Sequence, residues 1–427
     1  MFRLPSNDVR LVTCLVIVLV AKRAAADDWP RFRGPNVDGI CSETGLLPSW
    51  PEGGPKKLWE IKNLGRGWSN ISFAGGRMFT MGDRKAEGNT TRQYVLALDE
   101  ATQQELWATP IGPGHSDGPR CTPTVDGDLL YALGTDGDLV CLETATGKLQ
   151  WAKNYIRDFG SENIPWKFSE SPLVDGEKLV CTPGSHDAMM VALNKKTGEV
   201  IWKCPMPNLG PKGKDRAGYA SMVVAEIDGV RQYVQNTGRG IVGVEASSGK
   251  FLWGYNRIAG ASAEIPTPVV RGNYVFAANG YDTGSAVLKV TRQGDRFNVE
   301  EVCFLGPKQF QNHHGGFVLV GDYIYGGHGH NAGALTCIEF LTGKIMWQAE
   351  PLGKGSASVL YADGKLYVRY ENALVALVDA SPKGLQIKGT FKTPTERMPN
   401  RTHPVIHDGK LYLRAHDVLM CFDIRQP

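Results

Sequence analysis

Apolar residues recur along the chain in short runs of roughly four to seven residues, the usual length of a β-strand. The runs are rich in Val, Leu, Tyr and Ile, and Asp-Gly or Thr-Gly pairs typical of tight turns separate them. Residues 126–151 (DGDLLYALGTDGDLVCLETATGKLQW) and 321–347 (GDYIYGGHGHNAGALTCIEFLTGKIMW) share one order of runs, turns and a Gly-rich loop. No stretch shows convincing helical periodicity, so the pattern predicts an all-β chain.

A tryptophan, or a residue that replaces it, closes each of these units, and these positions set the period, which is 44 to 51 residues. Four strands in a unit of this length predict one blade of a β-propeller. We expect each closing tryptophan to pack on the next blade, and the glycine of each Thr-Gly turn to supply a positive φ. The closing positions are Trp59, Trp107, Trp151, Trp202, Trp253, Trp347 and the substitutes Cys303 and Phe391.

The two ends of the chain complete one blade between them. The 36 residues after Phe391 supply three strand-like runs, near 404–407, 410–414 and 418–424, but no fourth. The missing run with its tryptophan is KKLWEIK at 56–62. Pairing the two ends would remove exposed sheet edges. The sequence therefore predicts an eight-bladed propeller of four-stranded blades over 56–427, with seven or nine blades as alternatives.

The segment before the propeller divides into two parts. Residues 1–26 have a basic start, an apolar run from Leu11 to Val20 and an Ala-Ala-Ala end, which predicts a secretory signal peptide. Residues 27–55 form a non-periodic arm that contains WPRFRGP (29–35). We expect an exported protein, periplasmic or extracellular, with no membrane span after cleavage. Lys22 and Arg23 leave an uncleaved anchor as the alternative.

The charge balance and the cysteines of the chain argue against nucleic-acid binding and against disulfides. The chain has 47 Lys and Arg against 44 Asp and Glu, and removing residues 1–26 leaves 43 of each sign. A neutral chain argues against nucleic-acid binding, which depends on basic surface. The eight cysteines outside the signal segment form no CxxC pair and none are adjacent, so we expect small buried thiols rather than disulfides. We expect a monomer.

The repeat resembles a known family. VLALDEATQQELW (95–107), MVALNKKTGEVIW (190–202) and VGVEASSGKFLW (242–253) are similar to the quinoprotein-type propeller repeat. That family includes quinone-dependent alcohol dehydrogenases and non-catalytic scaffolds similar to the outer-membrane assembly factor BamB. The resemblance covers about residues 56–427. For a catalytic member it implies pyrroloquinoline quinone and calcium in the central funnel, a catalytic Asp and usually a disulfide between adjacent cysteines.

This chain departs from the catalytic members, because it has no adjacent cysteines, no CxxCH segment and no Asp in a matching context. The first hypothesis is therefore a non-catalytic scaffold that binds an envelope or extracellular protein or peptide. The alternative is a quinone-dependent oxidoreductase of alcohols or sugars, with Arg120, Arg239 or Arg401 facing the quinone carboxylates. A third hypothesis is a polysaccharide- or small-ligand-binding module that uses Trp68, Trp166 and Tyr281.

Candidate binding residues gather on one predicted face. In an up-and-down blade, the loop after the second strand lies on the same side as the segments that link blades; we call this side the loop face. Four histidines fall between 313 and 330, and two of them would reach one metal ion, although zinc usually needs more ligands. The weak metal candidates are His313, His314, His328 and His330. The candidate binding residues are Trp68, Arg120, Glu170, Tyr219, Arg239, His313, His314, His328, His330, Arg401 and His403.

Overall fold

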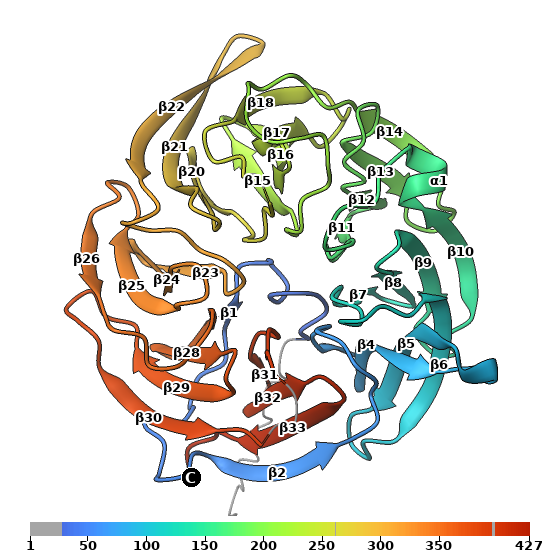
Figure 1. The fold of residues 1–427 in the computed structure, drawn as a ribbon, viewed down its shortest axis with the longest axis vertical. Helices are drawn as coiled ribbons and strands as arrows, with labels where there is room; N and C mark the ends of the chain where they lie inside the picture. The colour runs from blue at the N-terminus through green and yellow to red at the C-terminus, as the bar shows by residue number, and fades with distance from the viewer. Residues whose placement is uncertain (1–27, 261, 395–397) are drawn as a thin grey trace, which may run out of the picture.

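Eight antiparallel sheets stand in a ring around a central axis (Figure 1), as the repeat predicted. The computed structural model describes residues 28–260, 262–394 and 398–427. Each sheet is one blade of four strands, and an additional short strand joins the seventh. In the described residues, helix is limited to α1 (Tyr155–Phe159) and a 3₁₀ turn at Glu87–Asn89, and no helix is long and apolar enough to cross a membrane. The predicted signal peptide lies outside the described residues.

The blades follow one another along the chain, each running from an inner strand beside the axis to an outer strand at the rim (Figure 1). The strands of the first four blades are β3 (Ser72–Ala74), β4 (Arg77–Lys85), β5 (Thr91–Asp99) and β6 (Glu105–Pro113); β7 (Thr124–Asp126), β8 (Leu129–Leu133), β9 (Asp138–Glu143) and β10 (Leu149–Asn154); β11 (Leu173–Asp175), β12 (Lys178–Cys181), β13 (Met190–Asn194) and β14 (Val200–Cys204); β15 (Val223–Ile227), β16 (Val230–Thr237), β17 (Gly240–Glu245) and β18 (Phe251–Tyr255).

The other four blades keep the same order, except that the eighth takes its outer strand from the N-terminal side. Their strands are β19 (Val269–Arg271), β20 (Tyr274–Asn279), β21 (Gly284–Gln293) and β22 (Arg296–Leu305); β23 (Phe317–Val320), β24 (Tyr323–His328), β25 (Ala334–Glu339) and β26 (Ile345–Gln348); β27 (Ala357–Ala362), β28 (Lys365–Tyr370), β29 (Leu374–Asp379) and β30 (Ile387–Lys392); β31 (Val405–His407), β32 (Lys410–Ala415), β33 (Val418–Asp423) and β2 (Lys56–Ile61).

The indoles of Trp107, Trp151 and Trp347 each donate to a backbone carbonyl of the next blade, whereas the indole of Trp253 donates to Gln232 of its own blade. In β10 the pairing skips one residue before Trp151, which forms a bulge in the outer strand. The indole Nε1 of Trp151 donates to the Lys195 carbonyl of the third blade at 3.0 Å, and Trp107 donates to Thr144 of the second blade at 3.0 Å. The Thr-Gly glycines beneath these rings have positive φ, as predicted; Gly147 is at +70°.

The ring closes as expected, because β2 pairs antiparallel with β33 and places Trp59 opposite Cys421. Two fully buried arginines strengthen this closure. Arg369 in the seventh blade donates to the Arg414 carbonyl in the eighth at 2.5 Å. Arg414 in turn donates to carbonyl oxygens of the first blade, at 2.9 Å to Ser69 and 2.6 Å to Met81.

The N-terminal arm lies inside the ring, where Figure 1 shows it as the blue segment near the centre. Its carbonyls accept hydrogen bonds from inner strands: Trp29 O from Phe73 N and Pro30 O from Val125 N, both at 2.8 Å. Farther along, the arm forms β1 (Ile40–Cys41), which pairs parallel with β27 of the seventh blade. The arm therefore lies across the centre of the ring and contacts the inner strands of the first, second and seventh blades.

Candidate functional site

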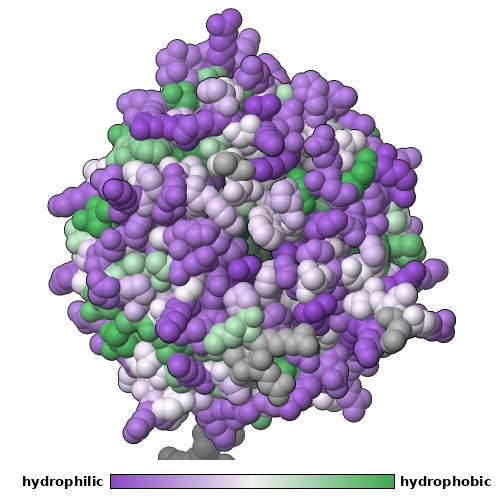
Figure 2. All heavy atoms as spheres, in the orientation of Figure 1, coloured by the Kyte–Doolittle hydropathy of each residue, from purple (hydrophilic) through white to green (hydrophobic). Residues whose placement is uncertain are grey.

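A cavity of about 290 Å³ opens at the mouth of the channel on the loop face, and we call it the cup. The molecular face drawn in Figure 2 is mostly hydrophilic and is hollowed near its centre. Most of the wall comes from segments that link consecutive blades, and loops within the fifth and sixth blades add Tyr281, His330 and Asn331. Arm residues Phe32 and Arg33 also contribute to the lining. Eight of the eleven candidate residues line the cup: Trp68, Arg120, Tyr219, His313, His314, His330, Arg401 and His403.

Trp68 carries two guanidinium groups over its ring. The Arg120 Cζ lies 5.2 Å from the ring centroid and the Arg401 Cζ lies 4.5 Å from it. Each cation–π contact of this kind stabilises by about 0.5–2 kcal/mol, more when water is excluded. Each arginine also has a carboxylate partner, since Arg120 Nη2 donates to Asp117 at 2.9 Å and Arg401 Nε lies 3.4 Å from Glu371.

The histidine cluster forms from two segments of the sixth blade. His313 and His314 precede β23, and His330 follows β24. The ring of His313 lies 3.5 Å from that of His314 and 4.1 Å from that of His330, measured between centroids. Tyr281, from the fifth blade, adds its hydroxyl 3.2 Å from His313 Nε2. Sequence neighbours therefore become neighbours in space.

The imidazoles at the centre of this cluster are uncharged at neutral pH. Burial, together with the adjacent imidazoles of His314 and His330, lowers the pKa of His313 to about 2. Burial also lowers the pKa of His314 to about 4, although Glu371 accepts at 3.2 Å from its Nδ1. A neutral imidazole has one donor and one acceptor nitrogen. The cluster therefore offers polar hydrogen-bonding groups without adding charge.

Three candidate residues point away from the cup. Glu170 is buried between blades and accepts from the Tyr155 hydroxyl at 2.5 Å, and burial raises its pKa to about 6. Arg239 is bound to Asp215 at 2.6 Å. His328, the last residue of β24, faces Phe310 and accepts from Gln311 N at 3.2 Å. Residues two apart on a strand face the same side, but the chain leaves β24 after His328, so His330 takes another direction.

Arg33 lines the cup although the sequence did not single it out. Its side chain is 3% exposed, and its Nη2 donates to the carbonyls of Phe317 at 2.6 Å and Asp38 at 2.8 Å. Its Nη1 has no acceptor and lies beside Gly316, where a Cβ would come within 2.8 Å of it. Arg120 likewise has a buried Nη1 without an acceptor. The repeat could not indicate Arg33, because the arm has no counterpart in the other units.

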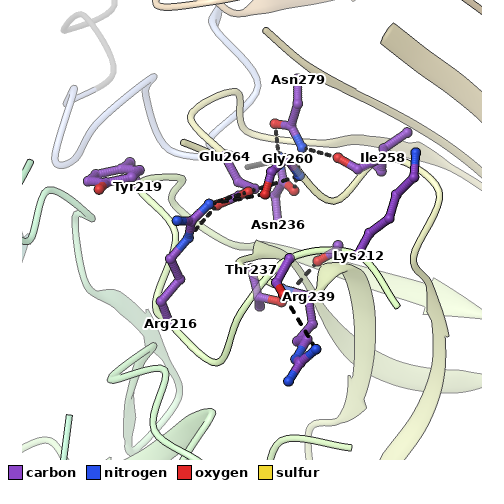
Figure 3. Close-up of polar contacts among 12 residues, drawn as sticks. Lys212, Arg216, Tyr219, Asn236, Thr237, Arg239, Ile258, Gly260, Glu264 and Asn279 are labelled. Atoms are coloured by element: carbon purple, nitrogen blue, oxygen red, sulfur yellow. Dashed lines mark hydrogen bonds and ion pairs between the residues drawn. The ribbon is translucent and has the colours of Figure 1, made fainter. Parts of the chain in front are cut away.

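A buried ion pair supports the wall around Tyr219. Arg216 donates from Nη2 to Glu264 Oε1 at 2.8 Å and from Nε to Oε2 at 3.2 Å, and Figure 3 shows the two groups facing each other. Gly260 N donates to the same carboxylate at 3.0 Å, and Tyr219 N donates to the Glu264 carbonyl at 2.7 Å. The pair therefore joins the segment before the fourth blade to the segment before the fifth.

The donor set of the cup does not suit calcium with a quinone. Calcium takes six to eight oxygen ligands, often from several carboxylates. Among the lining residues that the structure describes, Asp117 is the one carboxylate, and Arg120 already binds it. The Trp68 ring also carries two guanidinium groups rather than an open face. In the described part of the chain, no three His, Cys, Asp or Glu side chains converge to hold a metal ion, and His328 is apart from the other three histidines.

Comparison with known proteins shows the family. The sequence profile described as outer membrane protein assembly factor BamB matches residues 91–349, more than half of the chain. The dehydrogenase subunit of the quinone alcohol dehydrogenase of Gluconacetobacter polyoxogenes is 28% identical over 149 residues, which are 32% of this chain and 20% of that protein. The match thus spans about a fifth of that relative's length.

Two solved structures have the same fold. BamB from Moraxella catarrhalis has a TM-score of 0.58 at 14% identity, covering 87% of this chain and 100% of that one. The quinohemoprotein alcohol dehydrogenase from Comamonas testosteroni has a TM-score of 0.65 at 13% identity, covering 95% of this chain and 82% of that one. Identities this low show the fold alone. The profile match shows that the chain belongs to the BamB family of β-propellers with quinoprotein-type repeats.

Proposed function

We propose that this protein is an exported, non-catalytic binding protein whose cup receives an anionic ligand. The observation that carries the proposal is that two arginines that line the cup, Arg33 and Arg120, each have a buried Nη1 without an acceptor. A buried donor left unpaired costs about 1–3 kcal/mol, and a charged donor costs more. A ligand oxygen would recover that free energy, so the two groups are typical of a prepared binding site.

The polar pairs in the cup also favour binding over turnover. Tyr281 and His313 hydrogen-bond to each other, and His314 and Glu371 do the same. These contacts hold the side chains in place. The unsuitable donor set for calcium argues in the same direction. A BamB relative from Marinobacter adhaerens is described as an outer membrane protein assembly factor, which supports an envelope location and a protein partner that carries or delivers the ligand.

The proposal is tested by thermal unfolding with a panel of small anions. A ligand that binds only the folded state stabilises it by about 2.7 kcal/mol at a hundred times its Kd. We expect inorganic sulfate, benzoate or glutarate to raise the unfolding temperature of the wild type. Arg401→Gln should reduce the shift, and Arg92→Gln, at an exposed position of the first blade, should not. No shift with any anion would overturn the proposal.

The alternative is the oxidoreductase hypothesis, which the similarity to quinone alcohol dehydrogenases supports. A parallel titration distinguishes it from the proposal. Protein is mixed with pyrroloquinoline quinone and Ca²⁺, and reduction of an artificial electron acceptor is followed with a panel of alcohols. We expect no substrate-dependent reduction. Saturable quinone binding with turnover would overturn the non-catalytic part of the proposal.

A further inference from the structure

The wall of the cup contains both aromatic rings and guanidinium groups that have a nitrogen without an acceptor. Trp68, Trp166, Tyr219 and Tyr281 supply aromatic rings to its wall. The Trp166 side chain is 52% exposed, so a large apolar ring stands at the rim without a protein partner covering it. A large exposed aromatic ring beside a cavity is typical of a ligand contact. A pyranose ring presents an apolar C–H face that fits against such a ring.

The remaining wall is rich in groups that both donate and accept hydrogen bonds. The neutral imidazoles of His313 and His314 are of this kind, and so are the Asn70 and Asn331 amides and the Ser169 hydroxyl, all of which line the cup. Sugar hydroxyls also donate and accept, so they match such groups in either orientation. A ligand that carried only apolar groups would leave these donors unpaired.

The unpaired guanidinium donors add a requirement for charge. Arg33 and Arg120 each have a buried Nη1 without an acceptor, and Asp38 and Asp117 offset their charges without reaching these two nitrogens. A guanidinium N–H binds most strongly to an oxyanion such as a carboxylate or a sulfate. A neutral sugar would therefore use the rings and hydroxyl partners but not the strongest donors.

We propose that the cup binds a saccharide unit that carries one oxyanion, either a carboxylate or a sulfate ester. The anionic group pairs with Arg120 or Arg33, and the apolar face of the sugar ring packs against Trp166 at the rim. This inference rests on the proposed function, because it names the class of anion that the cup receives.

The test is isothermal titration calorimetry at low salt with four probes: glucuronate, glucose 6-sulfate, glucose and acetate. We expect glucuronate or glucose 6-sulfate to bind at least tenfold tighter than glucose and than acetate, which corresponds to about 1.4 kcal/mol per comparison. The stronger of the two identifies the oxyanion. Neither fragment reproduces the affinity, because glucose lacks the charge and acetate lacks the ring.

Two variants locate the binding. Arg120→Gln should weaken the anionic sugar at least tenfold and leave the weak affinity for glucose unchanged. Trp166→Ala should weaken both sugars and leave acetate unchanged. Trp166 is half exposed, so its truncation should not affect folding, which the unfolding temperature checks. Arg92→Gln is the matched control for loss of a charge away from the cup.

Each of the other outcomes would contradict one part of the proposal. Equal affinities for glucuronate and acetate would show that the sugar ring does not contribute to binding, and the cup would then be a simple anion site. Equal affinities for glucuronate and glucose would show that the oxyanion does not contribute to binding. If no sugar binds but small anions still raise the unfolding temperature through Arg401, the saccharide inference fails and the proposed function stands. If neither sugars nor small anions bind, both fail.

Discussion

The indole of Trp151 lies against the backbone of Gly198 in the neighbouring blade. A Cβ at Gly198 would come within 2.8 Å of the Trp151 ring, and the glycine has a φ of +73°. The same indole donates to the carbonyl of Lys195, three residues before the glycine. One turn therefore supplies both a flat surface for the ring and an acceptor for its N–H.

Substituting Gly198 with Ala should therefore lower the free energy of unfolding by more than the strain of a positive φ alone would. We expect Gly198→Ala to lower the free energy of unfolding by about 2–4 kcal/mol, combining backbone strain with displacement of the indole. Gly176→Ala is the matched control, because Gly176 has a φ of +59° but open space around its Cβ position. It should cost about 1 kcal/mol. Urea unfolding measures both, and equal losses would contradict the ring contact.

Closure of the propeller should depend on Arg414. Replacing this buried arginine with Met would leave the Ser69 and Met81 carbonyls of the first blade without their donor. We expect a loss of about 2–4 kcal/mol in the free energy of unfolding. Arg92→Met, at an exposed position, should change it by less than about 0.5 kcal/mol. Wild-type stability for Arg414→Met would show that the terminal pairing of β2 with β33 is sufficient.

One contact between the eighth and first blades should depend on pH. Burial lowers the pKa of His407, but Glu100, 3.3 Å from its Nε2, raises it together with Glu43 and Asp408, and the folded pKa is above the ordinary 6.5. A raised folded pKa contributes stability below pH 6.5 that disappears as the pH rises through the folded value. Glu100→Gln should therefore destabilise by about 1 kcal/mol at pH 6 and very little at pH 9.

Urea unfolding at the two pH values checks this, with Glu87→Gln as a control for loss of an exposed carboxylate. The control should show the same small change at pH 6 and pH 9. A loss for Glu100→Gln that grew with pH would contradict the assignment.

Thiol reactivity tests the absence of disulfides among the described cysteines. All eight are free, seven are buried, and Cys303 is half-buried. Burial raises the pKa of Cys303, so its reaction with Ellman's reagent at pH 8 should be slow but measurable. We expect one reactive thiol in the native protein and eight in denaturant for protein without residues 1–26. Cys303→Ser should remove the native reaction, whereas fewer than eight thiols in denaturant without reductant would reveal a disulfide.

The blades were predictable because their interactions repeat. Tryptophans that recur every 44 to 51 residues, with two substitutes, mark a contact that several blades make with the next one, as Trp107, Trp151 and Trp347 do. Local patterns also placed the fourth strand of the closing blade at the opposite end of the chain, where β2 pairs with β33. Such features depend on strand period and turn chemistry, which are local properties of the sequence.

The cup was only partly predictable, because its contacts join unrelated segments. Strand direction placed His313 and Arg401 on the loop face, and both line the cup. Glu371 was not among the candidates, although it binds His314 from the next blade. Arg33 belongs to a segment without a repeat, and its position depends on how the arm crosses the channel. These contacts join residues far apart in the chain, so the repeat pattern of the sequence does not predict them.

A crystal structure of the protein grown with glucuronate would test the central claim, that the cup is a ligand site, most directly. We predict density for the sugar in the cup, with a carboxylate oxygen within hydrogen-bond distance of Arg120 Nη1 or Arg33 Nη1. Crystals of Arg120→Gln under the same conditions should have lower occupancy. An empty cup at a glucuronate concentration that saturates binding in solution, or the sugar bound at another face, would contradict the claim.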